Sequence, residues 1–218
     1  MEKLDSGGTG CGEIDMSTPE TTHKVYLAGP DVFFRNAAAV MRRKGELALS
    51  YGFLPSSLAE DSGALGGDTP FDFGMSIGVA NEKMMDSSDF ILANLTPFRG
   101  ISADIGTAFE VGYMRAQGKP CFGYTNSARD YFTRLSDDFY AGSAFESDGA
   151  LTRAADGLMI ENHGMRDNLM LDTAIAKSGG RFVAGSVTGA AMGAQMLEDL
   201  TAFEEALVAA RAFFDHAA

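Results

Sequence analysis

The sequence has no tryptophan, only two cysteines and only three histidines among its 218 residues. Cys11 stands in a Gly/Ser-rich head and Cys121 in an apolar run, so a disulfide between them would tie a loose tail to a buried strand. We therefore expect reduced thiols and a cytoplasmic protein. His23, His163 and His216 form no close group with the cysteines, and a zinc site would need carboxylates to complete it. We expect no metal and no cofactor.

Long hydrophobic runs and a positive net charge are absent as well. No stretch approaches the roughly 20 consecutive apolar residues of a membrane-spanning helix, and the first residues lack the basic-then-apolar order of a signal peptide. The chain has 17 basic and 30 acidic residues, which gives a formal net charge of -13. This charge repels phosphate backbones and anionic lipids, so we expect no nucleic acid and no membrane as partner. Small molecules are the expected ligands.

The remaining composition is typical of a folded domain. Hydrophobic residues make up 45% of the chain and charged residues 22%, and the length suffices for one domain with a sizeable core. Residues 1–22 contain turn formers and charges without a hydrophobic period, which predicts a disordered leader or an expression remnant. The folded domain is expected to comprise residues 23–218.

Strand-like and helix-like segments alternate through the first part of this domain. The expected strands are residues 24–29, 53–57, 89–95 and 120–125, and the expected helices are residues 37–52, 75–86, 105–117 and 127–135. Alternation at this spacing favours a parallel sheet with helices on both faces, which is a flavodoxin-like, doubly wound α/β fold in a single domain. Further on, residues 178–186 predict a final strand and residues 197–214 an amphipathic helix. Residues 136–166 are rich in loop formers and predict no element.

In such sheets, ligands bind beyond the carboxyl ends of the strands. The loop after the first strand reads AGPDVFF, and the loop after residue 95 reads TPFRGISADIGTAFE. If the two strands are neighbours, these loops bring Tyr26, Asp104 and Glu110 to one crevice. Structural roles remain open for all three residues. Asp104 is well placed as a helix N-cap, and Tyr26 could pack within the strand with its polar tip outward. Glu110 lies among apolar and small residues, where a buried carboxylate is costly.

Three segments of the chain resemble the nucleoside 2-deoxyribosyltransferases, most closely the branch seen in trypanosomatid parasites. They read VYLAGPDVF (25–33), DFILANLTPFRGISADIGTAFEVGYMRAQGKP (89–120) and NLMLD (168–172). The likeness covers roughly residues 24–125 and 157–172, and more loosely the last helix. The middle segment is the specific one, because its Asp, Gly-Thr, Glu-x-Gly-Tyr and Gly-Lys-Pro elements occur in order at the family spacing.

The resemblance implies a reaction in which Glu110 attacks the anomeric carbon of a 2'-deoxynucleoside and expels the base. A deoxyribosyl ester forms on the enzyme, and a second base then displaces it, so that configuration at C1' is retained. Asp104 would accept hydrogen bonds from the sugar hydroxyls, and Tyr26 would orient Glu110. Gly29 and Phe33, in the first loop, are expected to contact the substrate. The partners implied are a deoxynucleoside and a free nucleobase.

The third segment implies an oligomer. Asn168 matches an asparagine that the family contributes from a neighbouring subunit to the sugar 5'-hydroxyl, and Met170 would line the same pocket. We therefore expect a homodimer, or a higher homo-oligomer, with shared active sites.

One position departs from the family pattern. Some members have an aspartate on the second helix that handles the proton of the base, whereas this chain has Asn81 at the matching place. An amide cannot act as a general acid, so Asn81 could only form a hydrogen bond to the base. Asp72 is a speculative substitute.

Two other functions stay open at this level. The chain could be an N-glycoside hydrolase of nucleosides or nucleoside 5'-monophosphates. Family relatives that cleave monophosphates carry a serine ahead of the glutamate, however, and Asp104 in that region would repel a phosphate. The chain could also be a non-catalytic nucleotide-binding module, since fold does not fix function.

Overall fold

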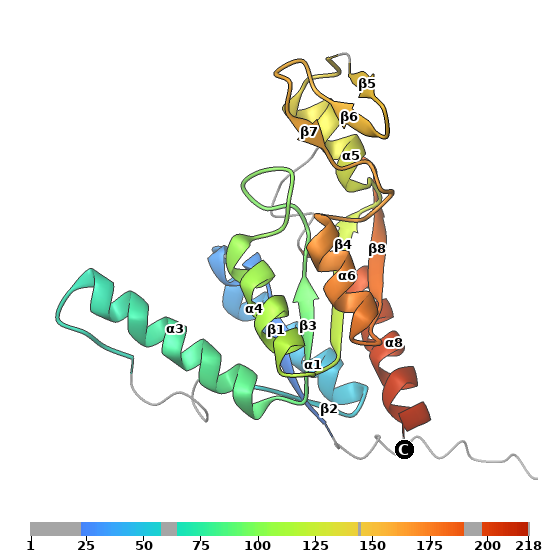
Figure 1. The fold of residues 1–218 in the computed structure, drawn as a ribbon. Coiled ribbons are helices and arrows are strands. Elements are labelled where there is room, and N and C mark those ends of the chain that lie inside the picture. The colour runs from blue at the N-terminus through green and yellow to red at the C-terminus, as the bar shows by residue number, and fades with distance from the viewer. Residues whose placement is uncertain (1–22, 58–64, 144, 190–197, 218) are drawn as a thin grey trace, which may run out of the picture.

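A computed structural model of the chain describes residues 23–57, 65–143, 145–189 and 198–217. Within these residues, five strands form a central parallel sheet, β1 (His23–Ala28), β2 (Phe53–Pro55), β3 (Phe90–Asn94), β4 (Cys121–Ser127) and β8 (Phe182–Val187). Their order across the sheet is β2-β1-β3-β4-β8, and every neighbouring pair is parallel (Figure 1). This is the flavodoxin-like, doubly wound order, as predicted.

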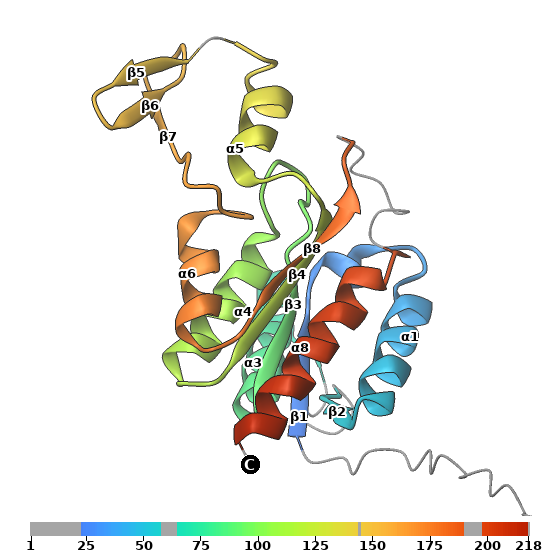
Figure 2. The same ribbon diagram turned by 90° about the vertical axis from the view of Figure 1, so that its right-hand side faces the viewer.

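Helices cover both faces of the sheet, as Figure 2 shows edge-on. Helices α1 (Ala37–Ser50) and α8 (Thr201–Ala217) lie on one face, and α3 (Pro70–Ser87), α4 (Ile105–Ala116) and α6 (Leu169–Lys177) lie on the other. Adjacent strand residues serve opposite faces, so Phe90 packs toward the first layer and Ile91 toward the second. Because both faces are covered, all five residues of β3 are buried.

The strand order changes direction at β1, and this places the predicted crevice. Strand β1 pairs with β3, with Ala28 opposite Ala93, so the segments that follow these two strands lie side by side. After β1 comes a short 3₁₀ turn, η1 (Pro30–Phe33), and after β3 comes the loop that leads into α4. The two loops singled out in the sequence are therefore neighbours.

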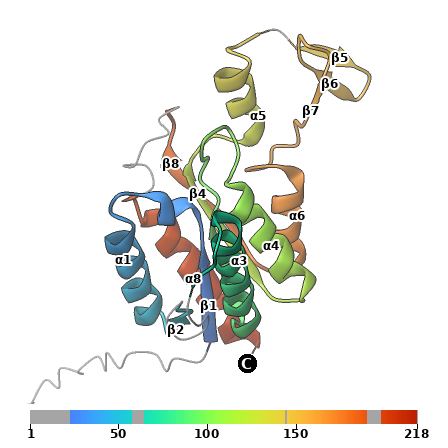
Figure 3. The same ribbon diagram turned by 90° about the vertical axis from the view of Figure 1, so that its left-hand side faces the viewer.

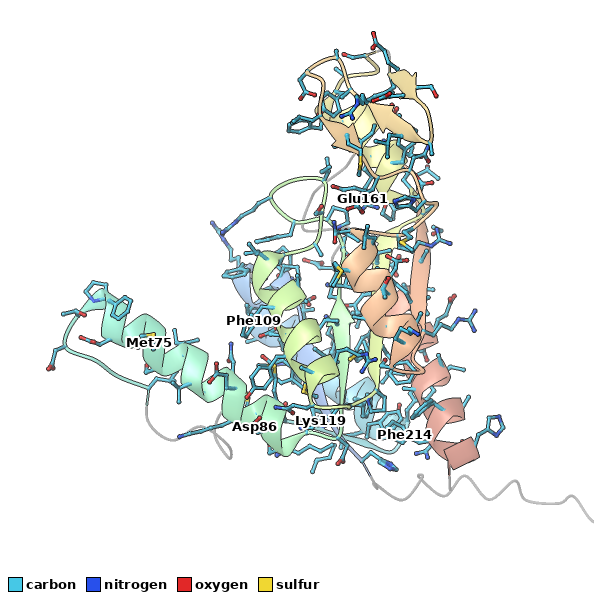
Figure 4. All side chains as sticks on the ribbon, viewed as in Figure 1. Met75, Asp86, Phe109, Lys119, Glu161 and Phe214 are labelled. Atoms are coloured by element: carbon cyan, nitrogen blue, oxygen red, sulfur yellow. The ribbon has the colours of Figure 1, made fainter. Side chains whose placement is uncertain are left out.

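Helix α3 begins five residues before the predicted start, at Pro70. Thr69 caps it, because the Thr69 hydroxyl accepts from the Asp72 amide while the Asp72 carboxylate accepts from the Thr69 amide. The first half of α3 is exposed and projects away from the sheet, with Met75 on the projecting part (Figures 1 and 4). Asp72 therefore belongs to the first turn of this helix, although it precedes the helix predicted over residues 75–86.

A small lobe stands beyond the carboxyl edge of the sheet (Figures 1 and 2). It contains the short helix α5 (Tyr131–Arg134), the π-helical turn η2 (Leu135–Phe139) and an antiparallel sheet of β5 (Glu146–Asp148), β6 (Leu151–Arg153) and β7 (Met159–Ile160). This sheet occupies the segment for which no element was predicted. The helix predicted over residues 127–135 starts later, because β4 continues to Ser127 beside β8 and Asp130 caps α5.

Two further points concern the ends of the chain and its surroundings. The predicted leader, residues 1–22, lies outside the described residues, as does Cys11, while Cys121 is a buried free thiol. None of the described helices combines the length and the apolar character that crossing a membrane requires.

Candidate functional site

The structure brings Tyr26 and Glu110 into direct contact. Tyr26 lies in the middle of β1 with its ring buried in the sheet, and its hydroxyl donates a hydrogen bond of 2.6 Å to Oε1 of Glu110. Glu110 projects from the second turn of α4 toward β1. A short hydrogen bond to a carboxylate fixes both its rotamer and its charge distribution.

Burial makes this carboxyl unusually basic. Loss of hydration raises the pKa of Glu110 to about 7, the hydrogen bond from Tyr26 partly offsets that rise, and the charge of Asp104 adds to it. Burial and the neighbouring Glu110 carboxyl also raise the pKa of the Tyr26 phenol, so it stays protonated and remains a donor. Glu110 therefore titrates near neutral pH, which is typical of a carboxyl that takes part in chemistry.

Asp104 has a structural role and an available oxygen. As the N-cap of α4 it accepts hydrogen bonds at Oδ2 from the amide and the hydroxyl of Thr107, at 3.0 and 3.1 Å. Among the described residues, Oδ1 accepts no hydrogen bond. The carboxylate lines the same pocket as Glu110. Capping and ligand binding are thus compatible at this residue.

One pocket of about 470 Å³ contains most of the predicted site. The end of β1, the turn η1, the second half of α3 and the first turns of α4 form its walls. Six predicted residues line it: Tyr26, Gly29, Phe33, Asn81, Asp104 and Glu110. The volume is within the range of small-molecule sites.

Asn168 and Met170 lie elsewhere in the chain. They line a second, largely apolar groove of about 780 Å³ between α4 and α6. Figure 3 shows α4 with α3 and β1 on one side of it and α6 on the other. Asn168 caps α6, and its side chain donates to Oε1 of Glu161 at 2.8 Å. Within one chain, therefore, these two residues and Glu110 line different hollows.

Asp72 lines neither hollow. Its carboxylate is engaged with the backbone and hydroxyl of Thr69 at the exposed start of α3. Since Asn81 does line the pocket of Glu110, the amide is the polar group that this part of α3 offers to a ligand.

Sequence reasoning missed a buried ion pair behind the pocket. Lys44 of α1 contacts Asp31 of η1, with 2.6 Å between Nζ and Oδ2, and Asn94 at the end of β3 also donates to this carboxylate. A signal for Lys44 was present, because Val40, Lys44 and Ala48 follow each other at helical spacing and are the buried positions of α1.

A second buried ion pair lies where the lobe meets the sheet. Arg134 donates to Asp167 at 2.9 Å, and Asp167 also accepts from the backbone amides of Ala103 and Asn168. Glu161, labelled at the base of the lobe in Figure 4, accepts from Asn168. This network links the residue before Asp104 to the cap of α6. No sequence signal could have found it, because its members come from segments for which no contact was predicted.

A positively charged side chain, Arg99, lies beside the mouth of the pocket. The guanidinium of Arg99 stacks on the rings of Phe33 and Phe98, at 5.1 and 4.7 Å from their centres. In the part of the chain that the structure describes, no three His, Cys, Asp or Glu side chains are grouped as a metal site would require.

The chain is similar to several known proteins. A sequence profile described as nucleoside 2-deoxyribosyltransferase matches residues 25–170. An uncharacterized protein of Schizosaccharomyces pombe is 32% identical over 190 residues, which are 81% of this chain and 88% of that protein. A structure described as 2-desoxiribosyltransferase from Leishmania mexicana is 28% identical, with a TM-score of 0.49, over 69% of this chain and 85% of the other.

A 2-deoxyribosyltransferase from Bacillus psychrosaccharolyticus is more distant. It is 19% identical, with a TM-score of 0.40, over 49% of this chain and 74% of its own. The profile match covers more than half of the chain and contains the pocket residues of β1, α3 and α4. The chain therefore belongs to the nucleoside 2-deoxyribosyltransferase family.

Proposed function

We propose that this protein transfers the 2-deoxyribosyl group from one nucleobase to another through a glycosyl ester on Glu110. The observation that carries the proposal is the contact between Tyr26 and Glu110 in a pocket of nucleoside size. A buried carboxyl that served packing alone would not need a dedicated phenol donor and an open pocket in front of it.

The chemistry runs in two displacements. First, a carboxylate oxygen of Glu110 forms a bond to C1' while the bond from C1' to the base nitrogen breaks, and the electron pair leaves with the base. A nitrogen of the second base then forms a bond to C1', and the ester oxygen leaves with its electron pair on Glu110. Each displacement inverts C1', so the net outcome is retention.

Asp104 and Asn81 would serve the two ends of the nucleoside. The unoccupied Oδ1 of Asp104 suits a sugar hydroxyl, and a carboxylate close to C1' also steadies positive charge developing on the sugar. A 2'-deoxyriboside reacts more readily than a riboside, because the missing 2'-hydroxyl makes the oxocarbenium-like transition state easier to reach. Asn81 would form a hydrogen bond to the base, while the leaving base takes a proton from solvent and the entering base loses one to solvent.

Asn168 would act in the site of a second subunit. Within one chain it lines the groove between α4 and α6 with Met170, outside the pocket of Glu110. The lining of that groove includes exposed apolar side chains, since Ile105 is 86% exposed and Met170 66%. Exposed apolar side chains of this kind are typical of a subunit interface. A homodimer that covers them would bring Asn168 to the partner's pocket.

The test separates transfer from its alternatives. The protein is incubated with deoxyadenosine or deoxyuridine in the presence and absence of a second free base, and the products are separated. Formation of the new deoxynucleoside supports transfer. Release of free deoxyribose alone would assign a hydrolase, cleavage restricted to 5'-monophosphates would assign a nucleotide hydrolase, and binding without turnover would assign a sensing module.

The ester itself is detected by mass spectrometry of intact protein quenched during turnover of a 2-fluoro-2-deoxy nucleoside, whose fluorine slows release of the ester. The sugar adduct should map to the peptide that contains Glu110 and be absent from Glu110→Ala. A wild type that turns over with its adduct on another residue would contradict the assigned nucleophile.

A further inference from the structure

The buried ion pair behind the pocket involves two of the least exposed charged residues in the described structure. Lys44 is 2% exposed and Asp31 is 1% exposed. Lys44 reaches up from α1 to the edge of the sheet, where its ammonium also lies 5.3 Å from the ring centres of Tyr124 and Phe203. The pair is thus enclosed by aromatic core rather than by solvent.

Asn94 completes this cluster. Its amide nitrogen donates to both oxygens of Asp31, at 3.2 and 3.1 Å, and its carbonyl oxygen accepts from the Thr96 amide at 3.1 Å. Asn94 is the last residue of β3, and Asp31 lies one turn beyond β1. The cluster therefore fastens the turn after one strand to the end of the neighbouring strand.

Stability alone does not account for such a cluster. Burial lowers the pKa of Lys44, and the charge of Asp31 only counteracts this effect. For a buried ion pair, the loss of hydration is comparable to the attraction gained, so well-packed apolar residues often serve stability equally well. The geometry that the cluster imposes is a better explanation for its presence.

The segment held by Asp31 is a wall of the pocket. Val32 and Phe33 line the pocket of Glu110 and are themselves mostly exposed, although the ring of Phe33 stacks on Phe98 with 5.3 Å between the ring centres. Pro30 and Asp31 are its buried residues. The fit is also tight at Gly29, where a Cβ atom would lie 2.6 Å from both Asn94 Cβ and Asp31 Oδ2. The position of this wall thus depends on the anchored carboxylate.

We propose that Lys44 is a positioning residue for the nucleoside pocket, acting through Asp31 on the turn that carries Val32 and Phe33. This inference rests on the proposed function for its kinetic consequence. Lys44 touches no reacting atom. The Lys44 ammonium holds the Asp31 carboxylate in place, and this carboxylate holds the turn. That turn sets the width of the pocket that binds the substrate.

The test compares Lys44→Met with the double variant Asp31→Asn/Lys44→Met and with Lys44→Arg. Lys44→Met keeps the length of the side chain but leaves a buried carboxylate without its cation, so we expect a lower Tm and a KM for the deoxynucleoside raised roughly tenfold with kcat little changed. The double variant has no charge left in the cluster. Its Tm should recover while its KM stays high, because the anchor is still missing.

Lys44→Arg keeps the charge and should recover part of the KM. Arg43→Met is the matched control, since Arg43 is the exposed neighbour of Lys44 on the same helix, and it should leave Tm and KM unchanged. Recovery of Tm and KM together in the double variant would mean that the pair serves folding alone and would overturn the inference.

Hydrogen exchange separates this inference from the proposed function. The amide of Phe34 donates to the Asp31 carbonyl across the turn, at 3.3 Å. In the double variant this amide should exchange at least several-fold faster, while the amides of β3 keep their protection. Unchanged protection at Phe34 would overturn the inference whether or not the wild type exchanges bases. Failure of the wild type to exchange any base, with Phe34 affected as expected, would refute only the proposed function.

Discussion

Helix α4 has two faces that meet two different hollows. Gly106, Thr107 and Glu110 follow Asp104 into a pocket that is small and carries charge, whereas Ile105, Ala108 and Gly112 face a larger, mostly apolar groove. Both stripes come from the same 12 residues. They differ in their chemistry: the first stripe carries polar groups suited to a small ligand, and the second forms part of an exposed apolar surface.

One face of α4 carries the groups proposed for chemistry, and the other carries the surface proposed for assembly. On the polar face, burial removes hydration from the Glu110 carboxyl and so raises its pKa. On the apolar face the side chains stay exposed, Ile105 most of all. In the proposed dimer the two hollows act together only between chains, because Glu110 lines one of them and Asn168 the other. The predictions below test that division, beginning with the largest effect.

Glu110→Ala should reduce base exchange at least roughly a thousandfold, because it removes the carboxylate proposed to form the ester. The fold should remain, since the side chain is replaced at the wall of a pocket. Exchange is measured by product separation, and the fold by thermal unfolding. If the variant unfolds near room temperature and the refolded protein still exchanges bases, the Glu110 carboxyl has a structural role and is not the nucleophile.

Asn168→Ala tests whether the apolar face serves a neighbour. Alone it should lower activity roughly a hundredfold, because a hydrogen bond to the sugar is lost in the transition state. Mixed in equal amounts with Glu110→Ala, it should regain activity from about a quarter of the sites, because half of the dimers are hybrids with one intact site each. Subunit exchange is confirmed with a tag. If confirmed hybrids show no recovery, Asn168 does not complete the site of a neighbouring subunit.

Asp104→Asn separates the two roles of that residue. Asparagine is as good an N-cap as aspartate, so α4 and the Tm should be preserved. The loss of charge beside the sugar should lower kcat/KM for a deoxynucleoside roughly thirtyfold. Preference for deoxyadenosine over adenosine is measured in the same assay. Equal rates of the wild type with both nucleosides would contradict the sugar-binding role.

The sheet and the charged pocket could be predicted because apolar runs mark the buried strands and turn-forming residues mark the strand ends. Residues 90–93 (FILA) are all apolar because β3 is covered on both faces, and the turn formers after β1 and β3 mark the strand ends. Once the strand order is known, Tyr26 and Glu110 must meet. The same reasoning did not extend to Lys44, whose charge suggested solvent although its spacing matched the buried stripe of α1.

The lobe could not be predicted in the same way. Its strands are two or three residues long, and all three residues of β5 are exposed, so no hydrophobic period distinguishes them from loops. Its attachment depends on Arg134 and Asp167, which are 33 residues apart in sequence. Long-range ion pairs of this kind leave no local pattern. The sequence therefore predicted which residues gather at the polar face better than it predicted the surroundings of Asn168.

The smallest effect expected is on the pH dependence, and it follows from the raised pKa of Glu110. The carboxyl must be ionised to attack, so kcat/KM should fall as the pH drops below about 7, the value to which burial raises its pKa. Tyr26→Phe removes the hydrogen bond that lowers this pKa while burial and Asp104 remain, so the acid limb should move up by about one pH unit. At high pH the loss should be only several-fold, since the nucleophile is present.

Stability has the opposite dependence on pH. A carboxyl whose pKa rises from 4.5 to about 7 on folding stabilises the fold below pH 4.5, and that contribution is lost as the pH rises to 7. Glu110→Gln, which cannot ionise, should therefore be more stable than the wild type above pH 7, by on the order of 3 kcal/mol at most. Denaturant unfolding at several pH values measures the difference. Two results together would contradict this account: a wild type whose stability does not fall between pH 4.5 and 7, and an acid limb that Tyr26→Phe does not move. They would mean that burial does not raise the pKa of Glu110.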